Sequence, residues 1–232
     1  MARLARVVIP EVAHHVTQRG NRRQPVFFSD DDRRVYLRLV ADACAATQTR
    51  CLAWCLMDNH VHLILVPATP DGLRAALAEA HRRYSRMVNF REGWRGYLFQ
   101  GRFASYPMDD AHLMAAVRYV ENNPVAARMV AEAADWRWSS ARSHLAGRRA
   151  KDDPLTDVAA LGAHVANWRA LLRIGLEAMD DPADVAAIEA RMRTGRPLAD
   201  PDWIAAMEAR MERKLGPLKR GPKRGLRSTA GV

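Results

Sequence analysis

Two short apolar segments separated by only two residues constrain the fold of this chain most strongly. The first covers residues 51–57 (CLAWCLM) and the second covers residues 60–66 (HVHLILV), with Asp58 and Asn59 between them. Apolar runs of this length on either side of a tight turn that contains Asp or Asn are typical of a β-hairpin. The sequence therefore predicts a pair of antiparallel strands here.

Strand-like and helix-like segments alternate on both sides of the predicted hairpin. Short apolar-rich stretches predict strands, and apolar residues spaced by three and four predict helices. The helix before the hairpin has Ser29 in the position of an N-cap. The expected elements are strands over 12–19 and 102–108 and helices over 30–47 and 71–91.

One more helix is expected after the last strand. Asp109 and Asp110 suit a helix N-terminus, where carboxylates interact favourably with the helix dipole, and we expect Pro124 to end the helix after Asn123. The full order is then β-α-β-β-α-β followed by a helix, which is the split βαβ arrangement. The sequence predicts an α+β, ferredoxin-like fold, with an antiparallel sheet and helices on one of its faces.

Charge is distributed unevenly along the chain and suggests three parts. Residues 1–150 carry 22 Arg and Lys against 14 Asp and Glu (+8), residues 151–209 carry 6 against 11 (−5), and residues 210–232 carry 8 against 1 (+7). We interpret these parts as a basic α+β domain, an acidic helical extension and a flexible basic tail. The helices expected beyond residue 150 cover 157–176, 182–193 and 201–215.

Composition limits the classes of protein that the chain can belong to. The net charge of +10 favours a polyanionic partner. Three cysteines form no complete set of disulfides, which favours a reducing compartment and a cytoplasmic protein. No apolar run approaches the ~20 residues that cross a bilayer, so we expect no membrane segment.

The segment MDNHVHLILV carries the most specific chemical feature. His60 and His62 are separated by one residue on a predicted strand, so both imidazoles point to the same face, while Val61, Leu63 and Leu65 point to the other. Two neutral imidazoles at this spacing suit one divalent metal ion. Alternatively, the two residues are ordinary histidines that only make hydrogen bonds.

A second feature lies on the predicted helix that follows residue 109. Tyr119 and Asn123 are four residues apart and therefore share one face of the helix. A tyrosine can act as a covalent nucleophile, and a carboxamide oxygen can bind a hard metal ion. The alternative is a half-buried tyrosine that packs in the core and an asparagine that caps the helix.

Taken together, these motifs resemble a known family. MDNHVHLIL, LFQGRF, YVENNPVAA and WRWSSARSHL occur in the order and spacing that are typical of the REP-associated tyrosine transposases, a group within the single-tyrosine HUH endonucleases. The resemblance covers about residues 5–150. It implies that His60 and His62 bind a divalent metal, Mg²⁺ or Mn²⁺, that Tyr119 is the nucleophile, and that Asn123 completes the metal site, where related transposases often have Gln.

The resemblance also implies an activity and a substrate. The chain is expected to be a metal-dependent single-strand DNA endonuclease and strand transferase that acts on hairpin-forming, REP-like palindromic DNA through a 5′-phosphotyrosine intermediate. Such a protein works as a monomer or as a homodimer that exchanges its tyrosine helices, and the sequence leaves both possibilities open. The base that activates Tyr119 is also open, with His15, His81 and His112 as candidates.

Arginines are the expected DNA contacts. Arg19, Arg22 and Arg23 follow the first predicted strand, and Arg102 lies in the aromatic segment LFQGRF. Arginine binds phosphates through charge and hydrogen bonds, while base edges and stacking read the sequence. Each arginine alone could equally be a solvated surface charge.

Two other functions are compatible with parts of the pattern. A DNA-hairpin-binding protein or repressor on the same fold would have no need of the histidine pair and Tyr119. An unrelated metal hydrolase would use the histidines alone. Only the transposase hypothesis requires a covalent DNA adduct at Tyr119.

Overall fold

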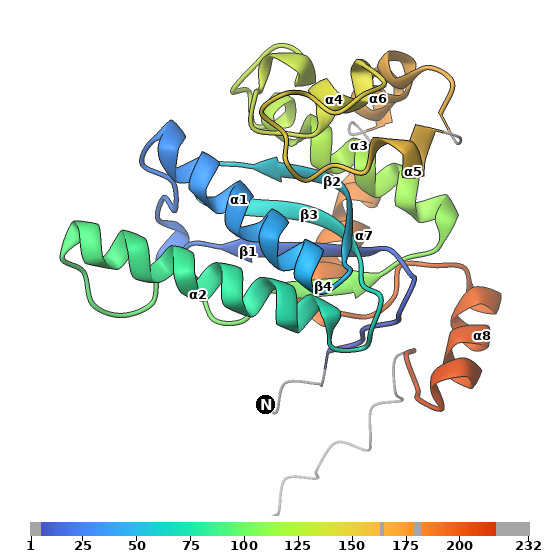
Figure 1. Cartoon of the computed structure of the whole chain (residues 1–232). Helices are drawn as coiled ribbons and strands as arrows, with labels where there is room; N and C mark the ends of the chain where they lie inside the picture. The colour runs from blue at the N-terminus through green and yellow to red at the C-terminus, as the bar shows by residue number, and fades with distance from the viewer. Residues whose placement is uncertain (1–5, 163–164, 179–181, 217–232) are drawn as a thin grey trace, which may run out of the picture.

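A four-stranded antiparallel sheet forms the centre of the protein (Figure 1). The computed structural model describes residues 6–162, 165–178 and 182–216. The strands are β1 (His14–Arg19), β2 (Arg50–Leu56), β3 (His60–Val66) and β4 (Ala104–Pro107). Their spatial order is β2-β3-β1-β4, with every neighbouring pair antiparallel. This order confirms the predicted ferredoxin-like arrangement.

The predicted hairpin is present, formed by β2 and β3. Cys55 pairs with His62 and Leu56 with Val61, and the amide of Met57 donates to the carbonyl of His60 at 2.9 Å. The turn is therefore as tight as two intervening residues require.

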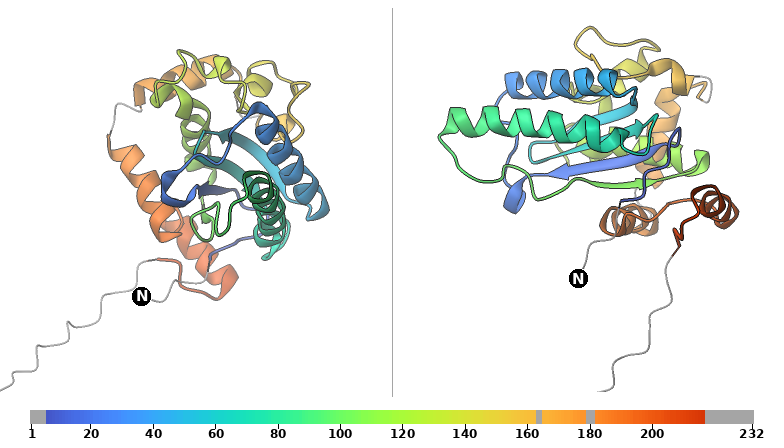
Figure 2. Two further views of the ribbon diagram at one scale, coloured as in Figure 1. Left: turned by 90° about the vertical axis from the view of Figure 1, so that its left-hand side faces the viewer. Right: turned by 60° about the horizontal axis from the view of Figure 1, so that its bottom comes forward.

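Helices cover both faces of the sheet, so the expectation of helices on one face is wrong. Figure 2 shows α1 and α2 against one face and α3 and α7 against the other. The helices are α1 (Asp30–Ala46), α2 (Gly72–Glu92), α3 (Asp110–Ala126), α4 (Ala141–Leu145), α5 (Val158–Gly162), α6 (Trp168–Ala178), α7 (Pro182–Thr194) and α8 (Pro201–Met211), with short 3₁₀ turns η1 (Asn21–Arg23) and η2 (Ala133–Asp135). None of the helices in the described residues is both long and apolar enough to cross a membrane.

The reason for the two covered faces lies in β3 itself. Val61, Leu63 and Leu65 pack in one core with α1 and α2, while Ile64 and Val66 pack in a second core with α3 and α6. A strand that is apolar on both faces must be covered on both.

The helix α3 continues past the proline that we expected to end it. Pro124 lies inside the helix and is buried, and the amide of Ala127 still donates to the carbonyl of Asn123 at 2.9 Å. Proline removes one helical hydrogen bond, here near the end of the helix, and burial of its ring in the protein offsets that loss.

Neither edge of the sheet is left bare. Along β2, the amide of Leu56 donates to the carbonyl of Trp138, and the amide of Ser140 donates to the carbonyl of Trp54. Along β4, the amide of Leu198 donates to the carbonyl of Pro107. Segments distant in sequence therefore cover both edges, which prevents pairing with other chains.

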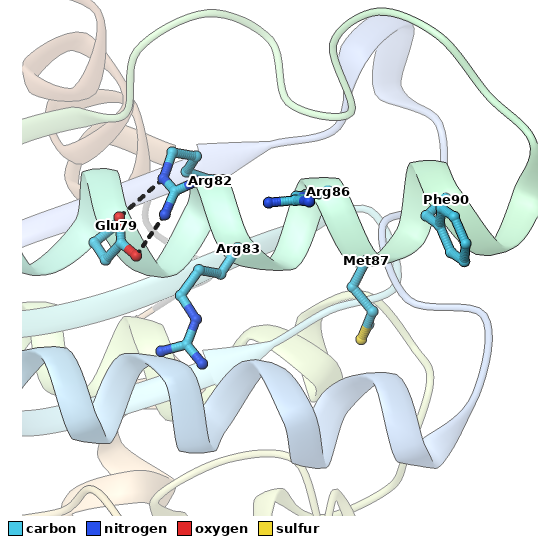
Figure 3. Close-up of a pocket in the computed structure, with 6 residues that line it drawn as sticks. All are labelled: Glu79, Arg82, Arg83, Arg86, Met87 and Phe90. Atoms are coloured by element: carbon cyan, nitrogen blue, oxygen red, sulfur yellow. Dashed lines mark hydrogen bonds and ion pairs between the residues drawn. The ribbon is translucent and has the colours of Figure 1, made fainter.

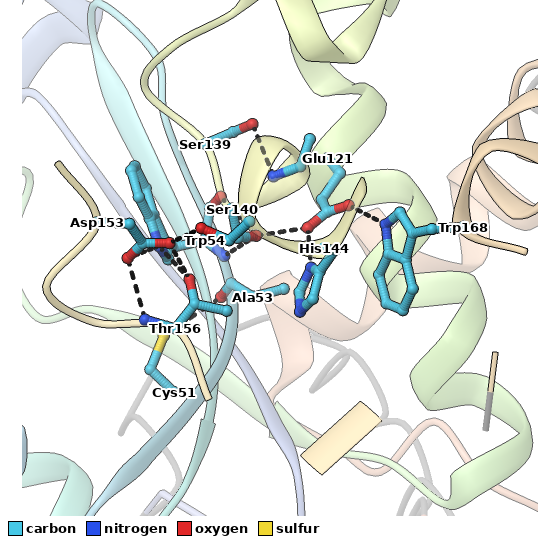
Figure 4. Close-up of polar contacts among 12 residues, drawn as sticks. Cys51, Ala53, Trp54, Glu121, Ser139, Ser140, His144, Asp153, Thr156 and Trp168 are labelled. Carbon is cyan, nitrogen blue, oxygen red and sulfur yellow. Dashed lines mark hydrogen bonds and ion pairs between the residues drawn. The ribbon is translucent and has the colours of Figure 1, made fainter. Parts of the chain in front are cut away.

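Residues beyond 150 are attached to the sheet through a buried carboxylate, that of Asp153 (Figure 4). It accepts hydrogen bonds from the hydroxyls of Ser143 and Thr156, both at 2.5 Å, and from Nε1 of Trp54 on β2 at 3.2 Å. The start of the acidic extension is thus tied to the basic part of the chain.

The division into residues 1–150, 151–209 and 210–232 stays a prediction. The single helix expected over 157–176 is in fact two, α5 and α6, separated by a segment that includes residues outside the described part. The helix expected over 201–215 ends at Met211. Most of the basic tail, from residue 217, lies outside the described residues.

We predict that Asp153→Ala lowers the free energy of unfolding by about 3 kcal/mol, because several buried donors lose their acceptor together. Asp152→Ala is the matched control. Asp152 is exposed and only pairs with Arg137 and Arg142 at 3.4 and 3.8 Å, so its loss should change stability by less than about 0.5 kcal/mol. Urea unfolding followed by circular dichroism measures both, and equal effects would contradict the anchoring role of Asp153.

Candidate active site

The two histidines of β3 lie side by side on the sheet face that α3 covers. His60 is the first residue of the strand, and its ring centroid lies 4.9 Å from that of His62. The intervening Val61 points into the core on the opposite face. The strand alternation therefore brings both imidazoles to one place, as predicted.

A third histidine holds His62 in position. Nε2 of His15, on β1, lies 2.9 Å from Nδ1 of His62, and Nδ1 of His15 lies 2.9 Å from the hydroxyl of Tyr106. When Nδ1 of His62 donates to Nε2 of His15, and Nδ1 of His15 donates to the hydroxyl of Tyr106, Nε2 of His62 keeps a free lone pair. That nitrogen is buried and has no hydrogen-bond partner.

Burial keeps all three imidazoles neutral. It lowers the pKa of His15 to about 3, and burial together with the charges of His60, His15 and Arg19 lowers the pKa of His62 well below its ordinary value. Burial and Arg19 lower the pKa of His60 to about 4, although a hydrogen bond with Asn123 acts in the opposite direction. Neutral imidazole is the form that binds metal ions.

Tyr119 projects from α3 onto the same spot. Its ring centroid lies 5.5 Å from that of His62 and 5.9 Å from that of His15. Asn123, one turn further along α3, is hydrogen-bonded to both Tyr119 and His60. A single chain therefore brings the tyrosine, the carboxamide and the histidine pair together.

The environment of Tyr119 opposes ionisation on balance. Burial raises the pKa of the phenol, and the carboxylate of Glu189 on α7 raises it further, whereas Asn123 and Arg19 lower it. No motif in the sequence pointed to Glu189, because it belongs to a helix that reaches the site only through the fold.

Of the three candidate bases, His15 alone lies beside Tyr119. His81 is on the opposite face of the sheet, where its Nε2 lies 3.0 Å from the hydroxyl of Tyr36. Nδ1 of His112 lies 2.6 Å from a carboxylate oxygen of Asp109 at the start of α3. Among the described residues, neither of these two rings contacts Tyr119, which removes both from the list of candidate bases.

The basic loop after β1 borders the site. Arg19 is paired with His60 in the sheet register, and η1 then exposes Arg22 and Arg23, both in the left-handed backbone region at φ 53° and 62°. A Cβ atom at Gly20 would lie 2.1 Å from the carbonyl oxygen of Gln24. The tight approach at Gly20 thus shapes the loop that carries these arginines.

Arg102 lies in the connection that leads into β4. It is exposed, and it lies near Arg6, whose pKa is lowered to about 10 by burial and by the charge of Arg102. The structure does not bring Arg102 into contact with Tyr119 or with the histidine pair.

A buried carboxylate that the sequence analysis missed fixes the outer side of α3 (Figure 4). Glu121 is fully buried; its Oε1 lies 2.5 Å from the hydroxyl of Ser140 and 2.6 Å from Nδ1 of His144, and its Oε2 accepts from Nε1 of Trp168 at 2.8 Å. Asn122 adds a hydrogen bond from Nδ2 to the carbonyl of Leu172 at 2.8 Å. The sequence offered no clear signal, because Glu121 and Asn122 stand among other polar residues of the same helix, such as Arg118 and Asn123.

The donor set fits a metal ion held by nitrogen and a carboxamide. Among the described residues, no three His, Cys, Asp or Glu side chains are grouped so as to hold a metal. His60, His62 and Asn123 offer two imidazole nitrogens and a carboxamide oxygen that could bind a metal ion, and Nε2 of His62 is buried with no hydrogen-bond partner among the described residues.

Comparison with known proteins agrees with this geometry. The profile of the IS200-like transposase family matches residues 9–123. A solved structure of a REP-associated tyrosine transposase bound to a REP hairpin has 20% sequence identity and a TM-score of 0.55, and the match covers 68% of this chain and 93% of that one. No curated protein sequence matches the chain.

A second solved structure is that of a Deinococcus radiodurans R1 protein assigned as a transposase. It has 20% sequence identity, and the match covers 52% of this chain and 97% of that one. Its TM-score of 0.37 is too low for a comparison of the folds. The family match includes the histidine pair, Tyr119 and Asn123. The resemblance seen in the sequence is confirmed: residues 9–123 match the IS200-like transposases, and the fold is that of a REP-associated tyrosine transposase.

Proposed function

We propose that the chain is a metal-dependent endonuclease and strand transferase that cuts hairpin-forming single-stranded DNA through a 5′-phosphotyrosine at Tyr119. The observation that carries the proposal is the meeting of Tyr119, Asn123 and the two β3 imidazoles within one chain. A hairpin substrate is supported by the REP hairpin bound to the structural neighbour.

We assign the metal to His60, His62 and Asn123. Asn123 is one methylene shorter than the Gln of related transposases, and its proximity to His60 and Tyr119 supports the assignment. A bound Mg²⁺ or Mn²⁺ would polarise the scissile phosphate and offset the charge that builds on its oxygens. His15 then acts as a positioning residue that fixes the ring of His62.

The covalent step balances without any other reactant. The phenol oxygen of Tyr119 loses its proton and forms a bond to phosphorus, while the bond from phosphorus to the 3′ oxygen breaks and that oxygen takes up a proton. The reverse attack by a 3′-hydroxyl rejoins DNA and releases Tyr119. Because burial raises the pKa of the phenol, the neighbouring cation of Arg19 is one of the groups that favour the reactive phenolate.

We further propose that Arg19, Arg22, Arg23 and Arg102 bind the phosphates of the DNA. All four lie on β1 or on the connections at the His60 end of the sheet. Because Tyr119 reaches the histidines of its own chain, a monomer suffices for cleavage. The three free thiols and the DNA substrate fit a cytoplasmic protein.

Tyr119→Phe tests the mechanism directly. A hairpin oligonucleotide from beside the gene, labelled at its 3′ end so that the fragment joined to Tyr119 carries the label, is incubated with Mn²⁺ and separated by denaturing electrophoresis. We expect the wild type to form a covalent adduct that maps to Tyr119, and the variant to form none while its hairpin affinity stays within about twofold, since the change removes one oxygen. Tight binding without adduct by the wild type would identify a non-catalytic hairpin binder.

His15→Ala tests the positioning of the metal ligand. Removing the partner of a ligating histidine typically weakens metal binding about 10–100-fold, so Mn²⁺ affinity measured by calorimetry should fall by that factor. The matched control is His81→Ala, which also removes a buried histidine bonded to a tyrosine hydroxyl but on the other face of the sheet. Equal Mn²⁺ affinity in the two variants would contradict the role given to His15.

A further inference from the structure

The exposed aromatic side chains of this protein gather at one place, around the C-terminal end of α2. Phe90 is 90% exposed and Tyr97 85%, while Phe28 and Trp94 are each 43% exposed and meet edge to face at 5.6 Å. Among the described residues, no other large aromatic side chain is exposed to this degree. Large rings left in water at one site indicate a surface that is covered by a ligand.

Cations accompany these rings. A hollow of about 500 Å³ runs along the outer face of α2, and the residues that line it recur at helical spacing (Figure 3). They are Glu79, Arg82, Arg83, Arg86, Met87 and Phe90. Arg82 is tied to Glu79 by two hydrogen bonds, but in the described part of the chain Arg83 and Arg86 form no ion pair within 4 Å.

This combination suits unpaired nucleotides better than another protein surface. The faces of unpaired bases stack on aromatic rings, and guanidinium groups bind the phosphates between them. In a duplex the base faces are already stacked on one another and are inaccessible. Arg83 and Arg86 also belong to a chain with a net charge of +10, which favours a polyanionic partner.

The loop that carries part of this surface is attached to the end of β1 beside the candidate active site. The amide of Gln100 donates to the carbonyl of Arg19, and the amide of Asn21 donates to the carbonyl of Leu98, both at 2.8 Å. The loop that carries Trp94 and Tyr97 is therefore hydrogen-bonded to the strand end that faces His60. Figure 1 shows the same end of the sheet beside the last turns of α2.

We propose that Phe28, Phe90, Trp94 and Tyr97, with Arg83 and Arg86, form a stacking surface that binds the single-stranded DNA flanking the cleaved position. This inference rests on the proposed function for the identity of the strand. The stacking surface is a second contact region, which holds several nucleotides while the scissile phosphate lies at Tyr119. The protein is therefore expected to bind hairpins with unpaired flanks more tightly than blunt hairpins.

The test measures binding alone, in chelator, so it does not depend on catalysis. The full-length protein is titrated into a fluorescent 20-nucleotide oligothymidine and into a blunt DNA hairpin, and affinity is read by anisotropy. For the double variant Phe90→Ala, Tyr97→Ala we expect oligothymidine affinity to fall at least about tenfold, because two bases lose the rings on which they stack. Blunt-hairpin affinity should change by less than about twofold.

Three further double variants complete the design. Phe90→Trp, Tyr97→Trp keeps aromatic faces and should restore binding, while Met129→Ala, Ile174→Ala removes two exposed apolar side chains elsewhere and should leave it unchanged. Arg83→Gln, Arg86→Gln should flatten the salt dependence of oligothymidine binding by about two phosphate contacts.

Several results would overturn the proposal. The first is that the alanine variant binds oligothymidine as tightly as the wild type does. The second is that the wild type does not bind oligothymidine. The third is that the alanine variant loses the same factor of affinity for oligothymidine and for the blunt hairpin. Self-association of the wild type that the alanine variant loses, seen by sedimentation, would instead assign the surface to contact between two copies. If the wild type forms an adduct at Tyr119 but the alanine variant keeps its oligothymidine affinity, the stacking surface is contradicted while the proposed nuclease activity is supported.

Discussion

The buried carboxylate of Glu121 is the interaction on which the arrangement of the site depends. It accepts hydrogen bonds from Ser140, His144 and Trp168, and so joins α3 to α4 and α6 through one group out of water. A buried carboxylate is costly unless its donors are in place, which favours a single packing of the helix. Residues two positions away on a helix point about 200° apart, so anchoring Glu121 outward turns Tyr119 and Asn123 toward the sheet.

Burial acts on the two halves of the site in opposite ways. It lowers the pKa of the imidazoles of His60 and His62, which leaves them neutral and able to bind a cation. The same burial raises the pKa of Tyr119 and disfavours the phenolate. The histidine pair and the tyrosine are therefore complementary. The neutral imidazoles can bind a cation, and the phenolate of Tyr119 needs a positive charge nearby to form. The protein's own contribution to that charge is Arg19.

The local features of the fold were predictable and the long-range ones were not. The hairpin, the shared face of His60 and His62, and the four-residue spacing of Tyr119 and Asn123 follow from strand and helix periodicity, which depends on neighbouring residues only. The prediction that the helix ends before Pro124 was wrong, because the burial of the proline ring depends on packing that no local rule describes. The contact between His15 and His62 joins residues 47 apart, and the second helical layer combines α3 with helices from beyond residue 150.

The proposed function requires that His60, His62 and Asn123 of one chain hold a metal beside Tyr119. Anomalous diffraction from crystals of the full chain grown with Mn²⁺ would locate that metal. We expect a peak within bonding distance of Nε2 of His62, with His60 and Asn123 of the same chain as the other protein ligands. A peak elsewhere, or one completed by Asn123 of a second chain, would contradict it.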